Sequence, residues 1–246
     1  MTPYYSDGSV TIYHGDLREA FAEVQDCTVD MIWTDPPYGN NNHDGDFNAA
    51  LNKFRGLESQ PIANDSPAEY KEIVDYTLDE AVRVLRPTSS IACCSGGGGP
   101  RTTFAWLADR LNQNGLRFFH AVIWDKLNPG LGWRYRRQYE FVMIAHLANG
   151  KLGWADERVV VPNIYRLSKP RDRRHPNEKP LPMVERFVQW HTRPTDLVLD
   201  PLMGSGTTLV AAKNHSRRAI GFELNERYCE VAASRCAQGV LELVGA

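Results

Sequence analysis

Short apolar runs alternate with stretches of helical periodicity along almost the whole chain, and this alternation leaves few fold classes open. The pattern predicts strands over residues 10–13, 29–34, 90–94, 118–124, 141–146, 197–200 and 219–223. It predicts helices over residues 17–24, 66–85, 102–114, 181–191, 207–214 and 226–238. Strands that alternate with helices indicate an α/β domain with a mainly parallel sheet, because each parallel connection needs a crossover segment.

The composition fits one globular domain over residues 1–246, with 42% hydrophobic and 24% charged residues. A formal net charge of −2 excludes a chain that is basic overall, although it allows local basic patches. No apolar stretch is long enough to span a membrane, and the N-terminus lacks a secretory pattern. The five cysteines show no metal-ligand spacing, so we expect reduced thiols, no metal site and a cytoplasmic location.

A glycine-rich turn joins a strand to a helix in the stretch LVLDPLMGSGTTLVAA. Gly204 and Gly206 would let the backbone approach a ligand closely, and the free N–H groups at the start of the following helix favour an anionic group. The next strand, AIGFE, ends in Glu223, where α/β nucleotide-binding folds hold a ribose diol. The turn therefore predicts a nucleoside ligand, with a merely tight strand–helix turn as the alternative.

Two common nucleotide motifs fit this turn poorly. A phosphate-binding P-loop needs a lysine before the Ser/Thr, and the stretch Gly206-Thr207-Thr208 has none. A dinucleotide fingerprint needs a third glycine or alanine, and Leu209 occupies that position. Asp200, at the end of the preceding strand, would repel a pyrophosphate and attract a cation. S-adenosylmethionine combines a ribose with positively charged groups, so it suits both carboxylates of this region.

The stretch MIWTDPPYGN places one carboxylate, two prolines and a tyrosine directly after an apolar strand. A simple turn is one interpretation, because Asp, Pro and Gly are turn formers and Pro cannot donate to a sheet ladder. In open α/β sheets, however, ligands bind beyond the carboxyl ends of the strands. Asp35 and the glycine turn both follow such ends, so we expect them at one edge of the sheet.

Four stretches, DPPY, DPLMGSGTT, GFELNE and HPNEKP, together resemble the amino-methyltransferases of DNA. Their order, with DPPY before the glycine turn, resembles the β group of these enzymes. The resemblance covers most of the chain and implies a Rossmann-like α/β sheet that binds S-adenosylmethionine, is circularly permuted and carries a small inserted recognition region. It also implies methyl transfer to the exocyclic amine of adenine or cytosine.

The resemblance further implies positions around the cofactor. Asp16, at the end of TIYHGD, corresponds to the carboxylate that faces the adenine ring, and Lys179 belongs to the block near the methionine end. The full set of expected cofactor-binding residues is Asp16, Lys179, Asp200, Gly204, Gly206, Thr207, Thr208, Glu223, Leu224 and Asn225.

The chemistry expected of DPPY starts from the target amine, a poor nucleophile because its lone pair is delocalised into the base. Asp35 and the carbonyl of Pro36 would each accept a hydrogen bond from the amine and direct its lone pair at the methyl group. Pro37 would help to hold that carbonyl in direction, and Tyr38 would stack on a base flipped out of the duplex. Adenine-N6 enzymes of the β group commonly carry Asp at the first position of this motif and N4-cytosine enzymes more often Ser. The resemblance therefore favours N6 of adenine, with N4 of cytosine as the alternative.

Methylation at C5 of cytosine is not expected, because no cysteine follows a proline in the manner needed for attack on the base. Cys93 and Cys94 lie in an apolar strand and are predicted to pack in the core. Two other interpretations stay open. The chain could modify RNA or a protein glutamine, or it could be a nucleic-acid-binding module that has lost catalysis.

Two local basic clusters in a mildly acidic chain predict contacts to DNA phosphates, with solvated charged loops as the alternative. Their residues are Lys126, Arg134, Arg136, Arg137, Lys169, Arg171, Arg173 and Arg174. The resemblance implies that segment 148–178 is the target-recognition insertion, and residues 39–66 are an expected mobile loop after the catalytic motif. The expected partner is double-stranded DNA, and the resemblance adds a homodimer and a cognate restriction endonuclease; no membrane partner is expected.

Overall fold

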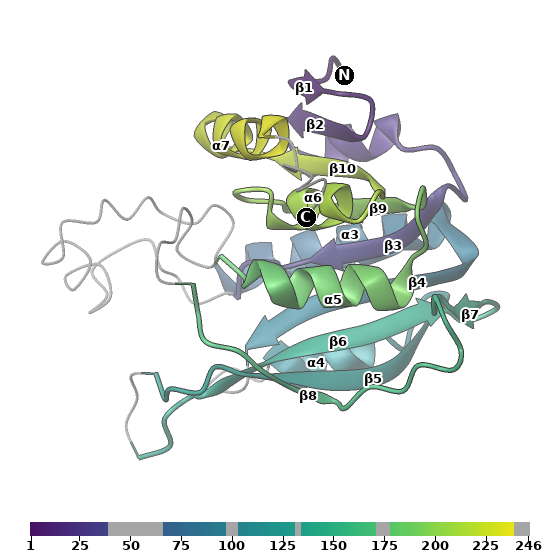
Figure 1. Ribbon diagram of the computed structural model, residues 1–246. Helices are drawn as coiled ribbons and strands as arrows, with labels where there is room; N and C mark the ends of the chain where they lie inside the picture. The colour runs from purple at the N-terminus through teal and green to yellow at the C-terminus, as the bar shows by residue number, and fades with distance from the viewer. Residues whose placement is uncertain (39–65, 97–102, 131–133, 171–177, 239–246) are drawn as a thin grey trace, which may run out of the picture.

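The computed structural model describes residues 1–38, 66–96, 103–130, 134–170 and 178–238, and Figure 1 shows a central sheet with helices on both faces. The strands are β1 (Tyr5–Ser6), β2 (Val10–His14), β3 (Val29–Thr34), β4 (Leu85–Gly96), β5 (Leu116–Asp125), β6 (Tyr139–Leu147), β7 (Lys151–Leu152), β8 (Ile164–Arg166), β9 (Leu197–Asp200) and β10 (Arg218–Glu223). The helices are α1 (Leu17–Ala20), the 3₁₀ turn η1 (Phe21–Glu23), α3 (Pro67–Val84), α4 (Thr103–Arg110), α5 (Leu181–His191), α6 (Thr207–Asn214) and α7 (Glu226–Ala237).

The sheet runs in the order β1-β2-β10-β9-β3-β4-β6-β5-β8, and β7 pairs with β4. The strands from β2 to β4 in this order are parallel to one another, whereas β6 is antiparallel to both β4 and β5. The predicted α/β domain with a mainly parallel sheet is therefore confirmed. Two strands from the end of the chain, β9 and β10, fill the middle of the sheet between β2 and β3.

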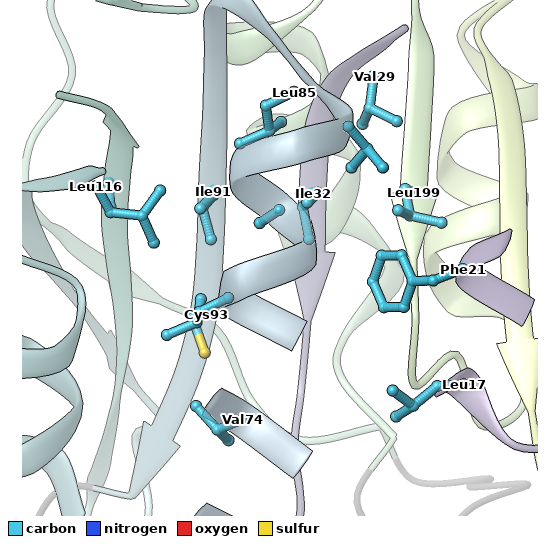
Figure 2. Packing of buried hydrophobic residues seen from close by; sticks show 14 of the residues in the cluster. Leu17, Phe21, Val29, Ile32, Val74, Leu85, Ile91, Cys93, Leu116 and Leu199 are labelled. Atoms are coloured by element: carbon cyan, nitrogen blue, oxygen red, sulfur yellow. The ribbon is translucent and has the colours of Figure 1, made fainter. Parts of the chain in front are cut away.

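The central strand β3 is buried on both faces, as its apolar sequence predicts. All six residues of VDMIWT are buried, which is typical of a parallel strand covered by helices on each side. Ile32 belongs to an apolar cluster with residues of α1, α3 and α4, and Trp33 belongs to a second cluster with residues of α5, α6 and α7. Figure 2 shows Ile32 with Ile91 and Leu199 from the two neighbouring strands in the first cluster.

Helix α3 begins at a capping box. Glu69 N donates to Ser66 Oγ at 3.2 Å, and Ser66 N donates to Glu69 Oε2 at 3.2 Å. These bonds satisfy backbone N–H groups that have no partner inside the first turn. The proline in that turn has no N–H group and therefore needs no hydrogen-bond partner. The helix runs to Val84 and continues directly into β4.

Every expected strand and helix has a counterpart in the structure, but some boundaries differ. The helix expected over residues 102–114 ends at Arg110. After Arg110 the chain continues in tighter turns, with bonds from Asn112 N to Asp109 O and from Gln113 N to Arg110 O. Asn114 and Gly115 then adopt left-handed φ values of 48° and 89°, which prevent a further helical turn. In the described parts of the chain, no helix is long and apolar enough to cross a membrane.

Within segment 148–178, residues 148–170 are more regular than expected. They contain β7, which pairs with β4, and β8, which pairs with the edge of β5. The segment is thus held to the sheet at β7 and at β8, although its sequence predicted no strand there. The loop expected over residues 39–66 lies outside the described residues except for Ser66.

Candidate active site

Three parallel strands end together at one edge of the sheet, each beside an acidic side chain. Strand β9 pairs with β3 on one side and with β10 on the other. Asp35 follows β3, Asp200 closes β9 and Glu223 closes β10. All three residues line one pocket, so the DPPY motif and the glycine turn do meet at the carboxyl edge of the sheet.

Most of the residues expected to bind cofactor or target base line this pocket. They are Asp16, Asp35, Pro36, Pro37, Lys179, Asp200, Gly204, Thr207, Thr208, Glu223, Leu224 and Asn225. Tyr38 and Gly206 are not among the lining residues. Trp33, Glu178 and Tyr228 also line the pocket but were not predicted. Of these three, only Glu178 could have been predicted from the sequence, because it lies in the HPNEKP motif directly before Lys179.

The glycine turn fixes the carboxylate of Glu223. Gly204 N donates to Glu223 Oε2 at 3.0 Å, and Asn225 N donates to Glu223 Oε1 at 2.8 Å. Gly204 adopts a φ of 50°, which a glycine reaches without strain. Burial nevertheless raises the pKa of Glu223. The carboxylate is thus held in one orientation at the pocket by backbone dipoles rather than by a cationic side chain.

Gly206, which was expected to let a ligand approach the backbone, does not line the pocket and lies close to α7. It adopts a φ of 77° as the N-cap of α6. A Cβ added here would lie 2.6 Å from the Cβ of Ala232 on α7, which is closer than real Cβ contacts. A side chain at this position would therefore clash with α7, and the role of Gly206 toward a ligand stays a prediction.

Asp200 is the most deeply buried acid of the pocket, with 3% of the residue exposed. Its Oδ1 accepts a hydrogen bond from Leu202 N at 3.1 Å. Burial raises the pKa of Asp200 to about 7, assisted by the charges of Asp35 and Glu223 and opposed by hydrogen bonds from Thr208 and Leu202. A positive ligand group beside Asp200 would favour its ionised form.

Asp16 brings a further carboxylate to the same pocket from β2. It is the N-cap of α1, where its Oδ1 accepts a hydrogen bond from Arg18 N at 2.8 Å. The adjacent Gly15 N donates to the carbonyl of Glu223 at 3.0 Å. This bond ties the end of β2 to the end of β10, so the two acidic residues line neighbouring parts of the pocket.

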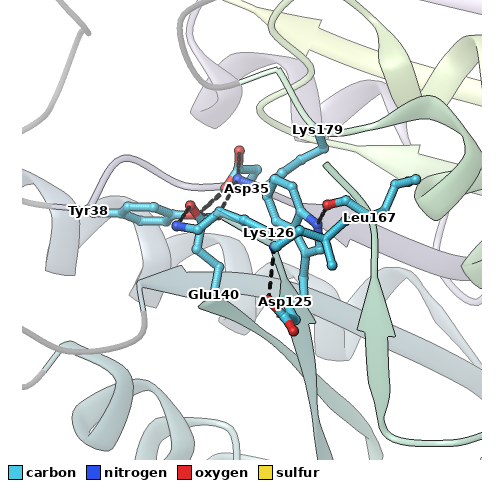
Figure 3. Close-up of polar contacts among 9 residues, drawn as sticks. Asp35, Tyr38, Asp125, Lys126, Glu140, Leu167 and Lys179 are labelled. Carbon is cyan, nitrogen blue, oxygen red and sulfur yellow. Dashed lines mark hydrogen bonds and ion pairs between the residues drawn. The ribbon is translucent and has the colours of Figure 1, made fainter. Parts of the chain in front are cut away.

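Asp35 lies in a buried polar cluster, shown in Figure 3 and here named the Asp35 cluster, with Tyr38, Lys126, Glu140 and Lys179. The Tyr38 hydroxyl donates to Asp35 Oδ1 at 2.8 Å, and Lys179 Nζ donates to Asp35 Oδ2 at 2.7 Å. Lys179 Nζ also lies 3.2 Å from Glu140 Oε2. Lys126 Nζ pairs with Glu140 Oε1 at 3.2 Å. Two carboxylates thus face two ammonium groups.

This pairing controls ionisation in the Asp35 cluster. Burial would lower the pKa of Lys179, but the Asp35 and Glu140 carboxylates outweigh it and raise that pKa. Burial would raise the pKa of Glu140, but Lys179 and Lys126 lower it to about 2. Burial, together with the charges of Asp35 and Glu140, raises the pKa of Tyr38. At neutral pH, Lys179 is an ammonium group, Glu140 is a carboxylate and Tyr38 is a neutral hydroxyl donor.

Lys126 was expected to contact DNA, and the structure revises this expectation. Only 9% of the residue is exposed, and its ammonium group pairs with Glu140. Trp124 lies opposite Glu140 in the β5–β6 register, and residues two apart along a strand share a face. Lys126 therefore turns to the buried side that Glu140 occupies.

Lys179 was expected beside the methionine end of the cofactor. In the structure its residue lines the pocket, but its ammonium group is bonded to Asp35 and Glu140. Glu140 itself was not predicted as a site residue. The sequence feature that could have indicated Glu140 is that it is the only carboxylate in the mostly apolar strand YEFVMIAHL.

Residues 126–130 and 134–138, between β5 and β6, form an arm, and three expected DNA-contacting residues are exposed on it: Arg134, Arg136 and Arg137. Because β6 is antiparallel to both β4 and β5, the arm leaves the same sheet edge as Asp35. Its two sides are joined by bonds from Lys126 N to Gln138 O at 2.8 Å and from Gly130 N to Arg137 O at 2.9 Å. Arg136 Nε donates to Gly130 O at 2.8 Å, so this guanidinium also stabilises the arm.

The second basic cluster is only partly described. Lys169 is exposed, and its charge contributes to the low pKa of Glu140. Arg171, Arg173 and Arg174 lie outside the described residues.

Cys93 and Cys94 pack in the core, as predicted. They are 0% and 1% exposed, and they belong to the apolar clusters on opposite faces of the sheet. Burial raises the pKa of both thiols. A thiolate is the nucleophilic form of cysteine, so neither residue is suited to attack a base.

Comparisons with known proteins agree with this site. A family model described as DNA methylase, for N6 and N4 methyltransferases, matches residues 29–234. The Type II methyltransferase M2.DpnII of Streptococcus pneumoniae is 26% identical over 254 residues, covering 95% of this chain and 91% of that protein. The M1.HpyAVI–SAM complex is 26% identical, with a TM-score of 0.67 over 92% of this chain and 99% of that one.

A further solved structure, the PvuII DNA methyltransferase described as cytosine-N4-specific, has a TM-score of 0.74. It is 20% identical and covers 99% of this chain and 90% of that one, which shows a shared fold. The family match extends from the start of β3 almost to the end of α7 and includes both motifs of the pocket. The chain therefore belongs to the N6/N4 DNA methylase family.

Proposed function

We propose that this protein transfers the methyl group of S-adenosylmethionine to the N6 amine of an adenine flipped out of double-stranded DNA. One observation carries the proposal: Asp35 lines the same pocket as Asp200 and Glu223. A carboxylate that can hold an amine is thus adjacent to carboxylates that can hold a cationic nucleoside. The family match supports DNA as the substrate.

The residues of the pocket fit S-adenosylmethionine. Burial raises the pKa of Asp200 and of Glu223, and the positively charged groups of the ligand would offset that effect. The Glu223 oxygens accept backbone hydrogen bonds from Gly204 and Asn225, and a carboxylate has about four lone-pair sites, so a ribose hydroxyl can also bind there. Asp16 is available for the adenine end. When bound, the cofactor supplies a methyl group on a positively charged sulfur, which needs no further activation.

The chain's own residues prepare the target amine. Asp35 and the Pro36 carbonyl accept one hydrogen bond each from the amine, which localises the nitrogen lone pair. Lys179 holds the Asp35 carboxylate in place through its contact at 2.7 Å. Tyr38, anchored by its bond to Asp35, offers its ring to the flipped base. Placing the reacting atoms about 3–3.5 Å apart is then the main catalytic contribution.

The choice of adenine rests on the aspartate at the first position of DPPY. N4 of cytosine is the second candidate, because the PvuII structure is described as cytosine-N4-specific and shares the fold. The proposal includes a circularly permuted chain of the β group. The position of the late strand β9 beside the early strand β3 supports this order.

Mass spectrometry of nucleosides tests the proposal directly. Unmodified DNA is incubated with S-adenosylmethionine and either the wild-type protein or Asp35→Ala. N6-methyladenine in the wild-type sample alone supports the proposal, and N4-methylcytosine would correct the base while keeping the mechanism. Cofactor binding without any methylated nucleoside would overturn DNA methylation and direct the search to RNA, protein or a non-catalytic role.

Several finer expectations stay predictions. The exposed arginines of the β5–β6 arm would contact phosphates, and segment 148–178 would recognise the target sequence. We also propose a homodimer, a cognate endonuclease and a cytoplasmic location. Sedimentation of the protein with and without a DNA duplex would show whether it forms a homodimer.

A further inference from the structure

Arg235 on α7 is an almost buried arginine that contacts the glycine turn. Its side chain is 10% exposed. One terminal nitrogen, Nη1, donates to the Ser205 carbonyl at 2.6 Å, to Ser205 Oγ at 3.1 Å and to Thr207 Oγ1 at 3.2 Å. Ser205 and Thr207 both line the pocket. Arg235 thus holds the backbone and the hydroxyl groups of the turn from outside the pocket.

The other side of the same guanidinium reaches a second part of the pocket. Arg235 Nη2 lies 3.4 Å from Glu178 Oε1, and the Glu178 side chain is 6% exposed. Glu178 directly precedes Lys179 in the chain. Lys179 in turn donates to Asp35 at 2.7 Å. One side chain therefore connects the glycine turn to the peptide that presents Lys179 to Asp35.

An arginine suits this place better than other residues. Its planar guanidinium offers five N–H donors in fixed directions, so one group can bond to a carbonyl, two hydroxyls and a carboxylate. A lysine ammonium would concentrate its charge at one point. Packing of α7 does not by itself explain the arginine, because Cys229, Ala232 and Cys236 already supply the buried face of that helix.

We infer that Arg235 is a positioning residue that sets the glycine turn and the Glu178–Lys179 peptide in fixed relation to each other. It thereby couples cofactor binding to the placement of Lys179 against Asp35. The inference rests on the proposed function for its catalytic consequence. Its consequence for cofactor binding is independent of what the methyl acceptor is.

The test compares Arg235→Ala and Arg235→Lys with wild-type protein, and Arg227→Ala serves as the control. Arg227 is an exposed arginine near the start of the same helix. Calorimetry gives the Kd for S-adenosylmethionine, and methyl transfer to DNA at saturating cofactor gives kcat. Arg235→Ala is expected to raise Kd about tenfold, or about 1.4 kcal/mol, and to lower kcat at saturation. Arg235→Lys should restore part of both effects.

Glu178→Gln tests the second connection if Arg235→Ala folds poorly. It keeps the bonds from Arg235 to the turn but removes the ion pair, so kcat should fall more than Kd rises. A melting temperature that falls while Kd and kcat stay at the values of the Arg227→Ala control would overturn the inference. A protein that binds cofactor but methylates no DNA would contradict the proposed function alone, because the Kd comparison would still stand.

Discussion

The Asp35 cluster and the cofactor side of the pocket, with Asp200 and Glu223, stabilise their buried carboxylates in different ways. In the Asp35 cluster, Asp35 and Glu140 face Lys126 and Lys179 within hydrogen-bonding distance. On the cofactor side, the acids are held by backbone N–H groups and a hydroxyl group. Within the described residues, neither Asp200 nor Glu223 forms an ion pair.

This difference indicates which of the two regions has its buried charges balanced before a ligand binds. A buried carboxylate is costly unless a positive group compensates it. The Asp35 cluster contains its own compensation and is therefore formed before substrate arrives. The cofactor side lacks such compensation, because no described residue forms an ion pair with Asp200 or Glu223, and burial raises the pKa of Asp200 to about 7. A cationic ligand would supply it, so this region is selective for positive charge.

The largest expected effect separates the roles of the two regions. Asp35→Ala should lower methyl transfer by about 1000-fold, similar to the loss of a key polar contact to a transition state. The Kd for S-adenosylmethionine should change little, because Asp35 serves the amine. Asp35→Asn keeps the shape and is the matched control for charge. Equal losses of transfer and of cofactor affinity would contradict the assignment.

Removing one cation from the Asp35 cluster should destabilise the fold. Lys179→Met leaves Asp35 and Glu140 with Lys126 alone, and breaking a buried ion pair costs about 3–5 kcal/mol. Urea unfolding measures this loss in the free energy of unfolding. Adding Glu140→Gln restores the charge balance and should recover part of it. A double variant no more stable than Lys179→Met would show that charge balance does not govern this cluster.

Asp200→Asn should change the pH dependence of the ligand-free protein. An unfolded aspartate ionises near pH 4, whereas Asp200 in the folded chain ionises at about pH 7. The folded state holds the extra proton between these values, so stability falls as the pH rises through this window. The asparagine variant should lack this fall. Thermal unfolding across the window measures it, with wild-type protein as the reference.

The same variant should weaken cofactor binding. If binding needs the Asp200 charge, wild-type affinity should decrease by up to about tenfold for each pH unit below 7. Asp200→Asn should bind more weakly above pH 7, and its affinity should not follow this trend. Calorimetry at several pH values makes the comparison. Parallel trends in both proteins would remove Asp200 from the recognition of the cation.

The two glycines of the turn should separate packing from ligand binding. Gly206→Ala places a Cβ against Ala232, and overpacking costs about 1–3 kcal/mol. Ala232→Gly should relieve part of that loss in a double-mutant cycle. Gly204→Ala, whose residue lines the pocket, should affect cofactor Kd more than stability. Additive effects of the changes at 206 and 232 would disprove the contact as the cause.

The smallest effect concerns DNA binding. Arg137→Ala should reduce the slope of log affinity against log salt by about 1, as expected for one phosphate contact. Arg117→Ala is the matched control, because Arg117 is exposed near the opposite end of β5. Fluorescence anisotropy with a DNA duplex at several salt concentrations measures both slopes. Equal slopes for both variants would exclude the arm as a phosphate-binding surface.

The sequence predicted the strand ends and the carboxylates well, because each depends on a short local pattern. Asp35, Asp200 and Glu223 all lie at strand ends and line one pocket, as expected. Residues whose role depends on partners distant in the sequence were harder to predict. The contact of Gly206 with Ala232 comes from helix packing, which local pattern does not encode.

The burial of Lys126 and the importance of Glu140 escaped prediction for a similar reason. Both follow from the β5–β6 register, which decides which side chains share a face. A basic residue in a loop is usually exposed, and nothing local distinguished Lys126 from the arginines that follow it.

The position of β9 and β10 in the middle of the sheet also has a consequence for synthesis of the chain. A ribosome makes β2 and β3 early, but the strands that join them emerge only after β4 to β8 have been made. Until then, the flank of β3 that will pair with β9 presents unpaired N–H and C=O groups. Such long-range pairing is slow and leaves exposed edges open to misassociation. A nascent chain therefore contains Asp35 well before its pocket exists.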